Sequence, residues 1–337
     1  MRRAMLVFVV LCLAAADPAA AVVVKLGTIA PEGSPWHDTL RDIAASWQKL
    51  SNGQVTLRIY PGGVVGDEKT MIRKMRVGQL QAATVTGLGL ASLEKSFYAL
   101  LVPLMFADDG ELDSVRERLA PQLEQQLEKQ GFVVLAWGDA GWITFFTKTP
   151  VTRPAEAMAT KLFIGTDDST VVQLYKETGF NPVQLSAMDI LPSLQTGMLN
   201  AFTGTPLAAL AFQWFALAPN MTDLRFAALT GATIIDKRTW EKIPAEFRPK
   251  IMAASRASEA LVKEEVRRLN AESVGVMVKN GLKISRVTPV VQAEWVRLVE
   301  GLHGRIRGPI VPEAAFDAAL AARDEYRAAQ AKGSGAR

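Results

Sequence analysis

The sequence predicts an α/β protein made of two lobes. Strand and helix patterns follow each other in the order βαβαβ twice, once before and once after the β-rich stretch 137–165. This order is typical of parallel strands joined by right-handed crossovers. Roughly three hundred residues remain after an apolar N-terminal segment, which is long for one domain and suits two. We therefore expect residues 137–165 to form the waist between the lobes.

Residues 1–21 have the features of a secretory signal peptide. Arg2 and Arg3 precede an apolar run, and small residues at 19–21 provide a cleavage site. A retained N-terminal anchor is the alternative. Cys12, the only cysteine, lies in this segment, so the mature chain would have no disulfide, no cysteine-bound metal and no cysteine nucleophile. We expect export to the periplasm.

Charge and apolar runs exclude several classes of partner. The chain has 38 basic and 34 acidic residues and a formal net charge of +4, with the charges dispersed. Basic and aromatic residues do not cluster as nucleic-acid binding requires. No later apolar run reaches the length of a membrane span. We expect no nucleic-acid partner, no membrane-embedded segment in the mature chain, and a disordered Gly/Ser-containing tail at 328–337.

The first unit is expected to have strands at residues 22–28, 55–60 and 82–86. Apolar residues on one face predict a helix from Trp36 to Leu50, which Gly53 ends, and a second helix covers residues 67–77. Residues 112–129 are expected to form one or two helices, interrupted near Pro121. A strand at 132–137 leads into the waist.

The second unit is expected to have strands at residues 161–164, 183–185 and 199–202. Helices are expected at 169–178 and 186–197, and Thr205 with Pro206 starts another. A long helical run ends near Asn280, and a strand at 282–287 follows. The last core helix starts at Thr288 and carries one apolar stripe, formed by Val291, Trp295, Leu298, Val299 and Leu302.

A ligand site is expected between the lobes, because ligands bind at the carboxyl ends of parallel strands and in interdomain clefts. These strand ends are rich in Gly, Thr and Ser, and they include Thr86 and Thr205. The alternative for the nearby aromatic residues is core packing, which is the commoner role. The aromatic candidates for ligand contact are Trp36, Trp142, Phe163, Phe202 and Trp214.

The sequence offers no clear catalytic or metal-binding set. The two histidines, His37 and His303, lie far apart, and neither a nucleophile-elbow motif nor a phosphate-binding Walker loop occurs. The run Gly62–Gly66 resembles a Gly-rich loop but lacks dinucleotide spacing. Asp167 and Asp168 form a carboxylate pair, for which a helix cap beside Ser169 is the simpler role. We expect no enzyme, no cofactor and no metal.

Three blocks of motifs together resemble a known family. The first block contains Gly33-Ser34-Pro35, Tyr60-Pro61-Gly62, Val65-Gly66-Asp67-Glu68 and residues 75–80. The second contains Lys148-Thr149-Pro150, Pro154-Ala155-Glu156 and Lys161-Leu162-Phe163-Ile164. The third covers residues 179–183 and 189–201. In order and spacing they resemble the DctP-like solute receptors of tripartite ATP-independent periplasmic (TRAP) transporters.

The resemblance implies the two-lobed periplasmic binding protein fold, type II-like, with hinge strands and a long helix that spans both lobes. Residues 224–229 would be the second crossing strand and residues 245–280 the long helix. Lobe I would comprise residues 22–143 and 230–262, and lobe II residues 144–229 and 263–327. Such a receptor binds a small molecule between its lobes and delivers it to membrane permease subunits driven by an ion gradient.

This chain departs from the family pattern at the positions that bind ligand. The resemblance implies an arginine clamp for a ligand carboxylate, but Phe163 stands at that position and Ile143 at that of a second arginine. Ile29 and Thr86 replace polar or acidic residues, and Asn200 replaces an aspartate. The predicted ligand contacts are therefore Ile29, Trp36, Thr86, Trp142, Ile143, Phe163, Phe202, Thr205 and Trp214.

An arginine–carboxylate pair supplies both geometry and charge, and a desolvated carboxylate without it costs several kcal/mol. We therefore expect that the ligand is not a simple carboxylate but is apolar or aromatic, or has a neutral or cationic head. Lys148 or Lys161 could instead replace the missing arginine. The other functions left open are presentation of the ligand to a sensor, a secreted enzyme, and a receptor that has lost its ligand and serves as an interaction module.

Overall fold

The computed structural model describes residues 21–334, so the predicted signal peptide lies almost wholly outside the described residues. The first part of the chain forms β1 (Val22–Thr28), α1 (Pro35–Leu50), β2 (Val55–Tyr60), α2 (Glu68–Arg76), β3 (Ala82–Thr86), α3 (Gly87–Leu93), the 3-10 helix η1 (Lys95–Leu100) and α4 (Asp109–Lys129). The middle part forms β4 (Phe132–Thr147), α5 (Pro154–Met158), β5 (Lys161–Ile164), α6 (Ser169–Glu177), β6 (Asn181–Gln184), η2 (Ala187–Asp189), α7 (Ile190–Thr196), β7 (Ala201–Gly204), α8 (Pro206–Ala211) and η3 (Trp214–Ala216).

The last part forms β8 (Asn220–Asp223), β9 (Ala227–Asp236), α9 (Lys237–Lys242), α10 (Arg248–Lys279), β10 (Lys283–Arg286), α11 (Pro289–Glu300), α12 (His303–Ile306) and α13 (Glu313–Ser334). All the strands belong to one ten-stranded sheet with the main order β2-β1-β3-β9-β4-β7-β5-β6, and β8 and β10 branch from β4. Parallel pairs β1/β2, β1/β3, β5/β6 and β5/β7 form the two halves, as the repeated βαβαβ order predicts. The fold is therefore α/β and two-lobed.

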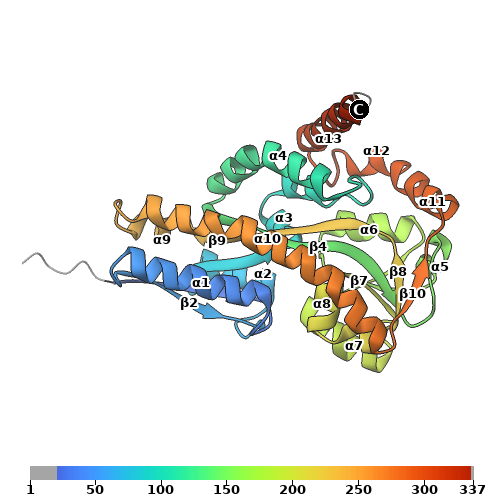
Figure 1. Cartoon of the computed structure of the whole chain (residues 1–337), viewed down its shortest axis with the longest axis horizontal. Helices are drawn as coiled ribbons and strands as arrows, with labels where there is room; N and C mark the ends of the chain where they lie inside the picture. The colour runs from blue at the N-terminus through green and yellow to red at the C-terminus, as the bar shows by residue number, and fades with distance from the viewer. Residues whose placement is uncertain (1–20, 335–337) are drawn as a thin grey trace, which may run out of the picture.

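The antiparallel strands β4 and β9 connect the two halves. Ile143 is the last residue of β4 that pairs with β9, and Thr144 is the first that pairs with β7. A register shift between Asp139 and Gly141 bends β4 just before this change of partner. Helix α10 lies across both halves and packs against α1, β4 and α8 (Figure 1). The waist of the molecule is thus a strand pair braced by one long helix.

Helix α10 is bonded to the bend in β4 by polar side chains. Asn270 donates to the carbonyl oxygen of Ala140 (3.1 Å) and accepts from the backbone N–H of Leu207 (3.0 Å) at the start of α8. A Cβ atom on Gly141, whose φ is +100°, would lie 2.5 Å from Asn270. Only glycine therefore fits this position without a shift of α10.

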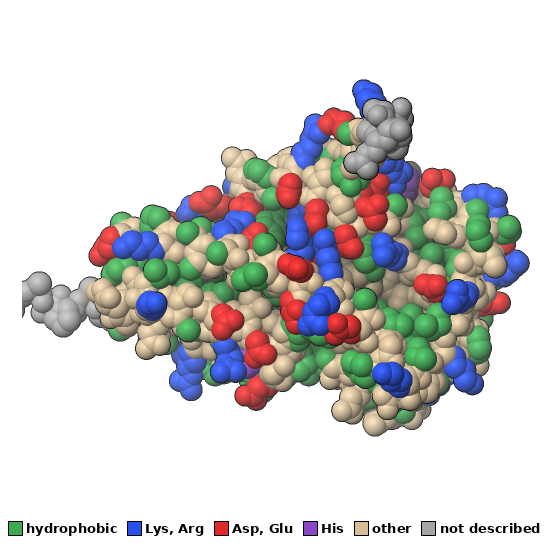
Figure 2. All heavy atoms as spheres, in the orientation of Figure 1, with side chains coloured by type: hydrophobic (Ala, Val, Ile, Leu, Met, Phe, Trp, Pro, Cys, Tyr) green, Lys and Arg blue, Asp and Glu red, His purple; other side chains and the backbone are tan. Residues whose placement is uncertain are grey.

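Arg267 forms the second connection between α10 and the waist. Its guanidinium donates two hydrogen bonds to Asp113 of α4, each 2.9 Å long, and two, of 3.1 and 2.9 Å, to Asp139 of β4. The side chain of Asp139 is only 2% exposed, and Arg267 together with the backbone N–H of Gly141 (2.9 Å) supplies its hydrogen bonds. Lys263 and Arg116 also pair with Asp113, and charges of both signs gather between α4 and α10 (Figure 2).

Four predictions about the elements differ from the structure. The second crossing strand is Ala227–Asp236, longer and later than the predicted residues 224–229. The expected disordered tail is wrong for residues 328–334, which continue α13. Helix α13, which the prediction places in lobe II, packs with Phe316, Ala319 and Ala322 into the core with α4 and η1. Near Pro121 the chain forms one uninterrupted helix. The remaining lobe boundaries stay predictions.

Candidate functional site

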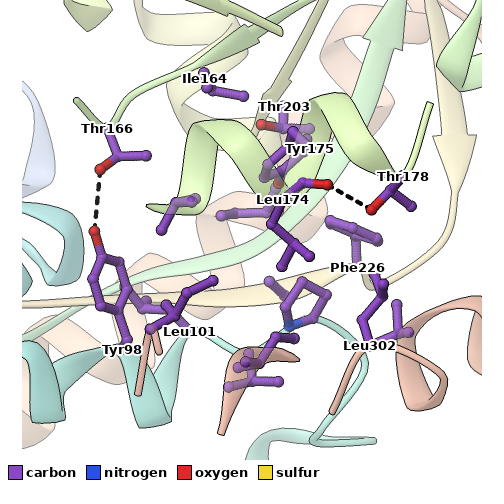
Figure 3. Close-up of a pocket in the computed structure, with 18 of the residues that line it drawn as sticks. Tyr98, Leu101, Ile164, Thr166, Leu174, Tyr175, Thr178, Thr203, Phe226 and Leu302 are labelled. Atoms are coloured by element: carbon purple, nitrogen blue, oxygen red, sulfur yellow. Dashed lines mark hydrogen bonds between the residues drawn. The ribbon is translucent and has the colours of Figure 1, made fainter. Parts of the chain in front are cut away.

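A cavity of about 180 Å³ lies where the two halves and the C-terminal helices meet (Figure 3). The first half contributes α3, η1 and the segment 101–103, and the second contributes β5, α6 and β7. The waist strands reach it through Ile143, Ala227 and Leu229, and α11, α12 and residues 310–311 complete the wall. A cavity shared by elements of both halves is a favoured place for a small molecule.

The wall of this cavity is apolar and uncharged. None of the described residues that line it is Asp, Glu, Lys, Arg or His. Its polar side chains are hydroxyls, and several are already engaged: the hydroxyls of Tyr98 and Thr166 share a hydrogen bond of 3.1 Å, and Thr178 donates to the carbonyl oxygen of Leu174 (2.6 Å). The cavity therefore favours an uncharged occupant, because a desolvated charge would find no opposite charge there.

Two helices direct one face each toward the cavity. On α6 this face is formed by Val171, Leu174, Tyr175 and Thr178, and α11 with its C-terminal extension presents Trp295, Leu298, Val299 and Leu302. Both sets follow the spacing i, i+3, i+4, i+7, which places side chains on one side of a helix. Helix α6 starts at Asp168, whose carboxylate accepts from the backbone N–H of Thr170 (2.9 Å).

Three consecutive residues of the second half contact the first half beside the cavity. Thr166 bonds with Tyr98, Asp167 pairs with Lys69, and Asp168 pairs with Lys95 (3.0 Å). Burial opposes the ionisation of Asp168, but Lys95 and the backbone N–H of Thr170 outweigh it and lower the pKa of this carboxyl. The carboxylate pair 167–168 thus forms contacts between the halves, and Asp168 is also the helix cap that the sequence predicts.

Replacing Lys69 and Lys95 with glutamine is expected to shift the protein toward an open form. The lysine–aspartate pairs cross between the halves, and exposed pairs of this kind are screened by salt. Small-angle scattering at low salt should show a larger radius of gyration for the double variant than for wild type, with the difference shrinking at high salt. Lys237→Gln breaks a pair with Glu128, both residues lying outside the second half, and is the control. An unchanged radius in the double variant would contradict this role.

Of the residues predicted to contact ligand, only Ile143 lines the cavity. The indole N–H of Trp36 donates to the carbonyl oxygen of Asp139 (3.0 Å), and that of Trp142 donates to Asp109 (2.9 Å). Thr86 donates to Glu68, and Ile29 packs against the large core of the first half. These four are half-buried, and ligand contact by them stays a prediction.

Phe163, Phe202 and Trp214 belong to one hydrophobic core in the second half. The Phe202 ring stacks on Phe146 with centroids 4.9 Å apart and meets Trp214 edge-on at 5.4 Å. Phe163 is 7% exposed and does not line the cavity, and ligand contact by its ring stays a prediction. Thr205 is fully buried and caps α8 through its hydroxyl.

The candidate basic residues and the candidate catalytic residues are engaged elsewhere. Lys148 and Lys161 donate to the carbonyl oxygens of Leu194 and Gly197 (2.7 and 3.2 Å), in and just after α7. His37 accepts from the backbone N–H of Gly33 (3.1 Å), and His303 packs edge-on against Phe316. Within residues 21–334, no group of three or more His, Cys, Asp or Glu side chains could hold a metal ion.

Glu68 is expected to make stability depend on pH in the acid range. Its carboxylate accepts from the backbone N–H (2.6 Å) and hydroxyl (2.9 Å) of Thr86. Burial raises the pKa of Glu68, although the Thr86 bonds oppose the shift. The folded state therefore binds this proton more tightly, so its contribution to stability falls as pH rises above the ordinary value of 4.5. Urea unfolding should show that the free energy of unfolding of wild type exceeds that of Glu68→Gln by less and less as the pH rises above 4.5. A constant or growing advantage would contradict the assignment.

Comparison with known proteins settles the family. The family model DctP, described as bacterial extracellular solute-binding protein, family 7, matches residues 26–307. The chain belongs to this family. It is thus a TRAP substrate-binding receptor with the two-lobed fold of that group. No helix among the described residues is both long and apolar enough to cross a membrane.

Several relatives align with this receptor over most of its length. The C4-dicarboxylate-binding periplasmic protein DctP of Rhodobacter capsulatus is 24% identical over 323 residues, 92% of this chain and 95% of the relative. The solved sugar acid binding protein of Advenella mimigardefordensis in complex with galactonate is 15% identical, has a TM-score of 0.85 and covers 91% of this chain and 99% of its own. A TRAP receptor of Shewanella oneidensis with bound succinate is 17% identical and has a TM-score of 0.84. The match covers 90% of this chain and 100% of the Shewanella chain. At these identities the solved structures establish the fold.

The apolar wall was missed by the sequence analysis, although a pattern for it exists. The stripe on α11 was interpreted as core, and the matching face of α6 was not singled out. The spacing i, i+3, i+4, i+7 on α6 can be seen in the sequence. In the structure only Val172 of this helix is buried, so the face toward the cavity stays partly accessible.

Proposed function

We propose that this receptor works in the periplasm, where it captures a small molecule between its lobes and delivers it to a TRAP permease. Residues 1–21 would direct its export. The observation that carries the proposal is the cavity walled by both halves and held closed by the contacts of residues 166–168. Closure around the solute would give the permease a form of the receptor that differs from the empty one.

We infer that the solute of this cavity is not a simple carboxylate. Ile143 stands in the wall where the family resemblance implies an arginine, and the described lining has no cation. A buried carboxylate without a cation costs several kcal/mol. The acids named for the Rhodobacter, Advenella and Shewanella proteins are ligands of those proteins. No catalytic role is proposed, since Asp167 and Asp168 serve as contacts between the halves.

A thermal-denaturation screen of small molecules tests the receptor function. A solute present at about a hundred times its dissociation constant should stabilise the protein by roughly 2.7 kcal/mol. We expect hits among uncharged molecules and none among dicarboxylates. Uptake of a hit by cells that carry the neighbouring permease genes, and loss of uptake without the receptor, tests delivery. Stabilisation by succinate alone would contradict the solute class, and enzymatic turnover of a hit would contradict the receptor function.

Replacing Ile143 with arginine is expected to let the receptor bind a carboxylate. The change places a cation in an otherwise uncharged wall, and a carboxylate would compensate the desolvated guanidinium. Succinate should raise the melting temperature of Ile143→Arg but not that of wild type. Ile143→Gln adds polarity without charge and should behave as wild type does. Equal responses of the arginine and glutamine variants would show that this wall does not decide charge selectivity.

A further inference from the structure

Tyr175 presents an unused hydrogen-bond donor at the cavity. It lies on the cavity face of α6 (Figure 3). Its ring meets Phe180 edge-on with centroids 5.5 Å apart. In the part of the chain that the structure describes, no group hydrogen-bonds with its hydroxyl. Tyr175 is half-buried, so its hydroxyl is open to the cavity, and an occupant with a hydrogen-bond acceptor would supply the missing partner.

The phenol acts as a donor at neutral pH. Burial raises the pKa of Tyr175 to about 12, so the hydroxyl keeps its proton throughout the physiological range. A neutral phenol in an apolar setting gains most from an oxygen acceptor. The bound molecule should therefore place a carbonyl, ether or hydroxyl oxygen against Tyr175.

The remaining polar groups of the wall limit what else the solute can carry. The hydroxyls of Tyr98, Thr166 and Thr178 are engaged within the protein. Among the described lining residues, only Thr203 of β7 adds a second side-chain hydroxyl without a hydrogen bond. A cationic head would find no carboxylate, and an anionic head would find no lysine or arginine. These groups match a solute that is neutral and has few polar atoms.

Cavity size limits the solute as well. An apolar cavity of about 150 Å³ in another protein holds one benzene molecule. The cavity of about 180 Å³ described above therefore suits a solute of one ring or of similar bulk with a short substituent. The aromatic and branched residues around it, among them Phe226 and Trp295, provide the matching surface.

We propose that Tyr175 determines specificity by donating a hydrogen bond to a neutral oxygen acceptor on a compact apolar solute about one ring in size. The inference rests on the proposed receptor function and names the solute class and the residue that selects it. A molecule of the same shape without the acceptor would leave the phenol unpaired. Loss of one such neutral hydrogen bond weakens binding about ten-fold.

The test uses three probes of the same size: acetophenone, which carries the acceptor, isopropylbenzene, which lacks it, and benzoate, which is charged. Their dissociation constants are measured on wild type, Tyr175→Phe and Tyr326→Phe. Tyr175→Phe removes only the hydroxyl. Tyr326→Phe makes the same change on α13, at a residue that does not line the cavity, and it is the matched control.

Wild type should bind acetophenone about ten-fold more tightly than isopropylbenzene and should bind benzoate least. Tyr175→Phe should lose the preference for acetophenone, because its carbonyl oxygen would then be desolvated without a donor, while Tyr326→Phe should keep the wild-type preference. The proposal is overturned if Tyr175→Phe keeps that preference, if wild type does not discriminate, or if benzoate binds most tightly. If no probe binds wild type, the assigned solute class is wrong. Recovery of a different solute from the native protein would then leave the receptor function intact, and recovery of none would contradict that function too.

Discussion

Replacing Trp295 with alanine is expected to lower the free energy of unfolding by about 3–5 kcal/mol. The Trp295 ring is completely buried and packs against Phe145 and Phe226, with centroids 5.1 and 5.6 Å away. Its indole N–H donates to the carbonyl oxygen of Thr152 (2.7 Å), which would lose this partner. Equilibrium unfolding in urea measures the loss.

Trp295→Phe keeps most of the ring volume and should cost clearly less than the alanine variant. Because Trp295 also lines the cavity, the alanine variant should bind bulkier apolar solutes than wild type does. A loss of stability below about 1 kcal/mol, in the range of ordinary surface substitutions, would mean that Trp295 is not the core residue described here.

Replacing Arg267 with methionine should also destabilise the protein, by about 3 kcal/mol. Methionine retains much of the apolar stem but leaves the buried carboxylate of Asp139 without its cation. The same change releases Asp113 of α4 from two hydrogen bonds. Urea unfolding should therefore show a lower midpoint with little change in slope.

Arg268 provides the matched control for Arg267. It is the next residue on α10, and it pairs with Glu265 and Glu272 on the exposed side of the helix. Arg268→Met removes the same charge but leaves no buried carboxylate, so stability should hardly change. Equal effects of the two substitutions would contradict the view that α10 is fastened to the waist through Arg267.

The sequence predicts the architecture well because its local patterns and its topology agree. Ser34, Asp168, Thr205 and Thr288 cap the helices that they precede, and the parallel strands of each half follow from the repeated βαβαβ order. The C-terminal helix was missed because its residues are small. Alanine is nevertheless a strong helix former, and Ala319 and Ala322 pack closely in the core shared with α4.

The site was harder to predict because a buried parallel sheet is covered on both faces. Phe163 and Phe202 lie on the face that packs against Trp214, whereas Ile164 and Thr203, one residue later in each strand, line the cavity. A step of one residue along a strand therefore moves from a core side chain to a cavity side chain. The residues on the two faces of the sheet are similarly hydrophobic, so the sequence does not distinguish them. The elements that complete the wall, α6, α11 and α12, come together only in the folded chain.

The central claim is that the cavity shared by the two halves holds an uncharged solute. Mass spectrometry of the small molecule released from receptor purified without denaturation tests this claim most directly. We predict a neutral compound about one ring in size, and we predict that Ile143→Arg no longer retains it. Recovery of a dicarboxylate or sugar acid that stays bound to wild type and does not respond to changes at Ile143 would contradict the claim.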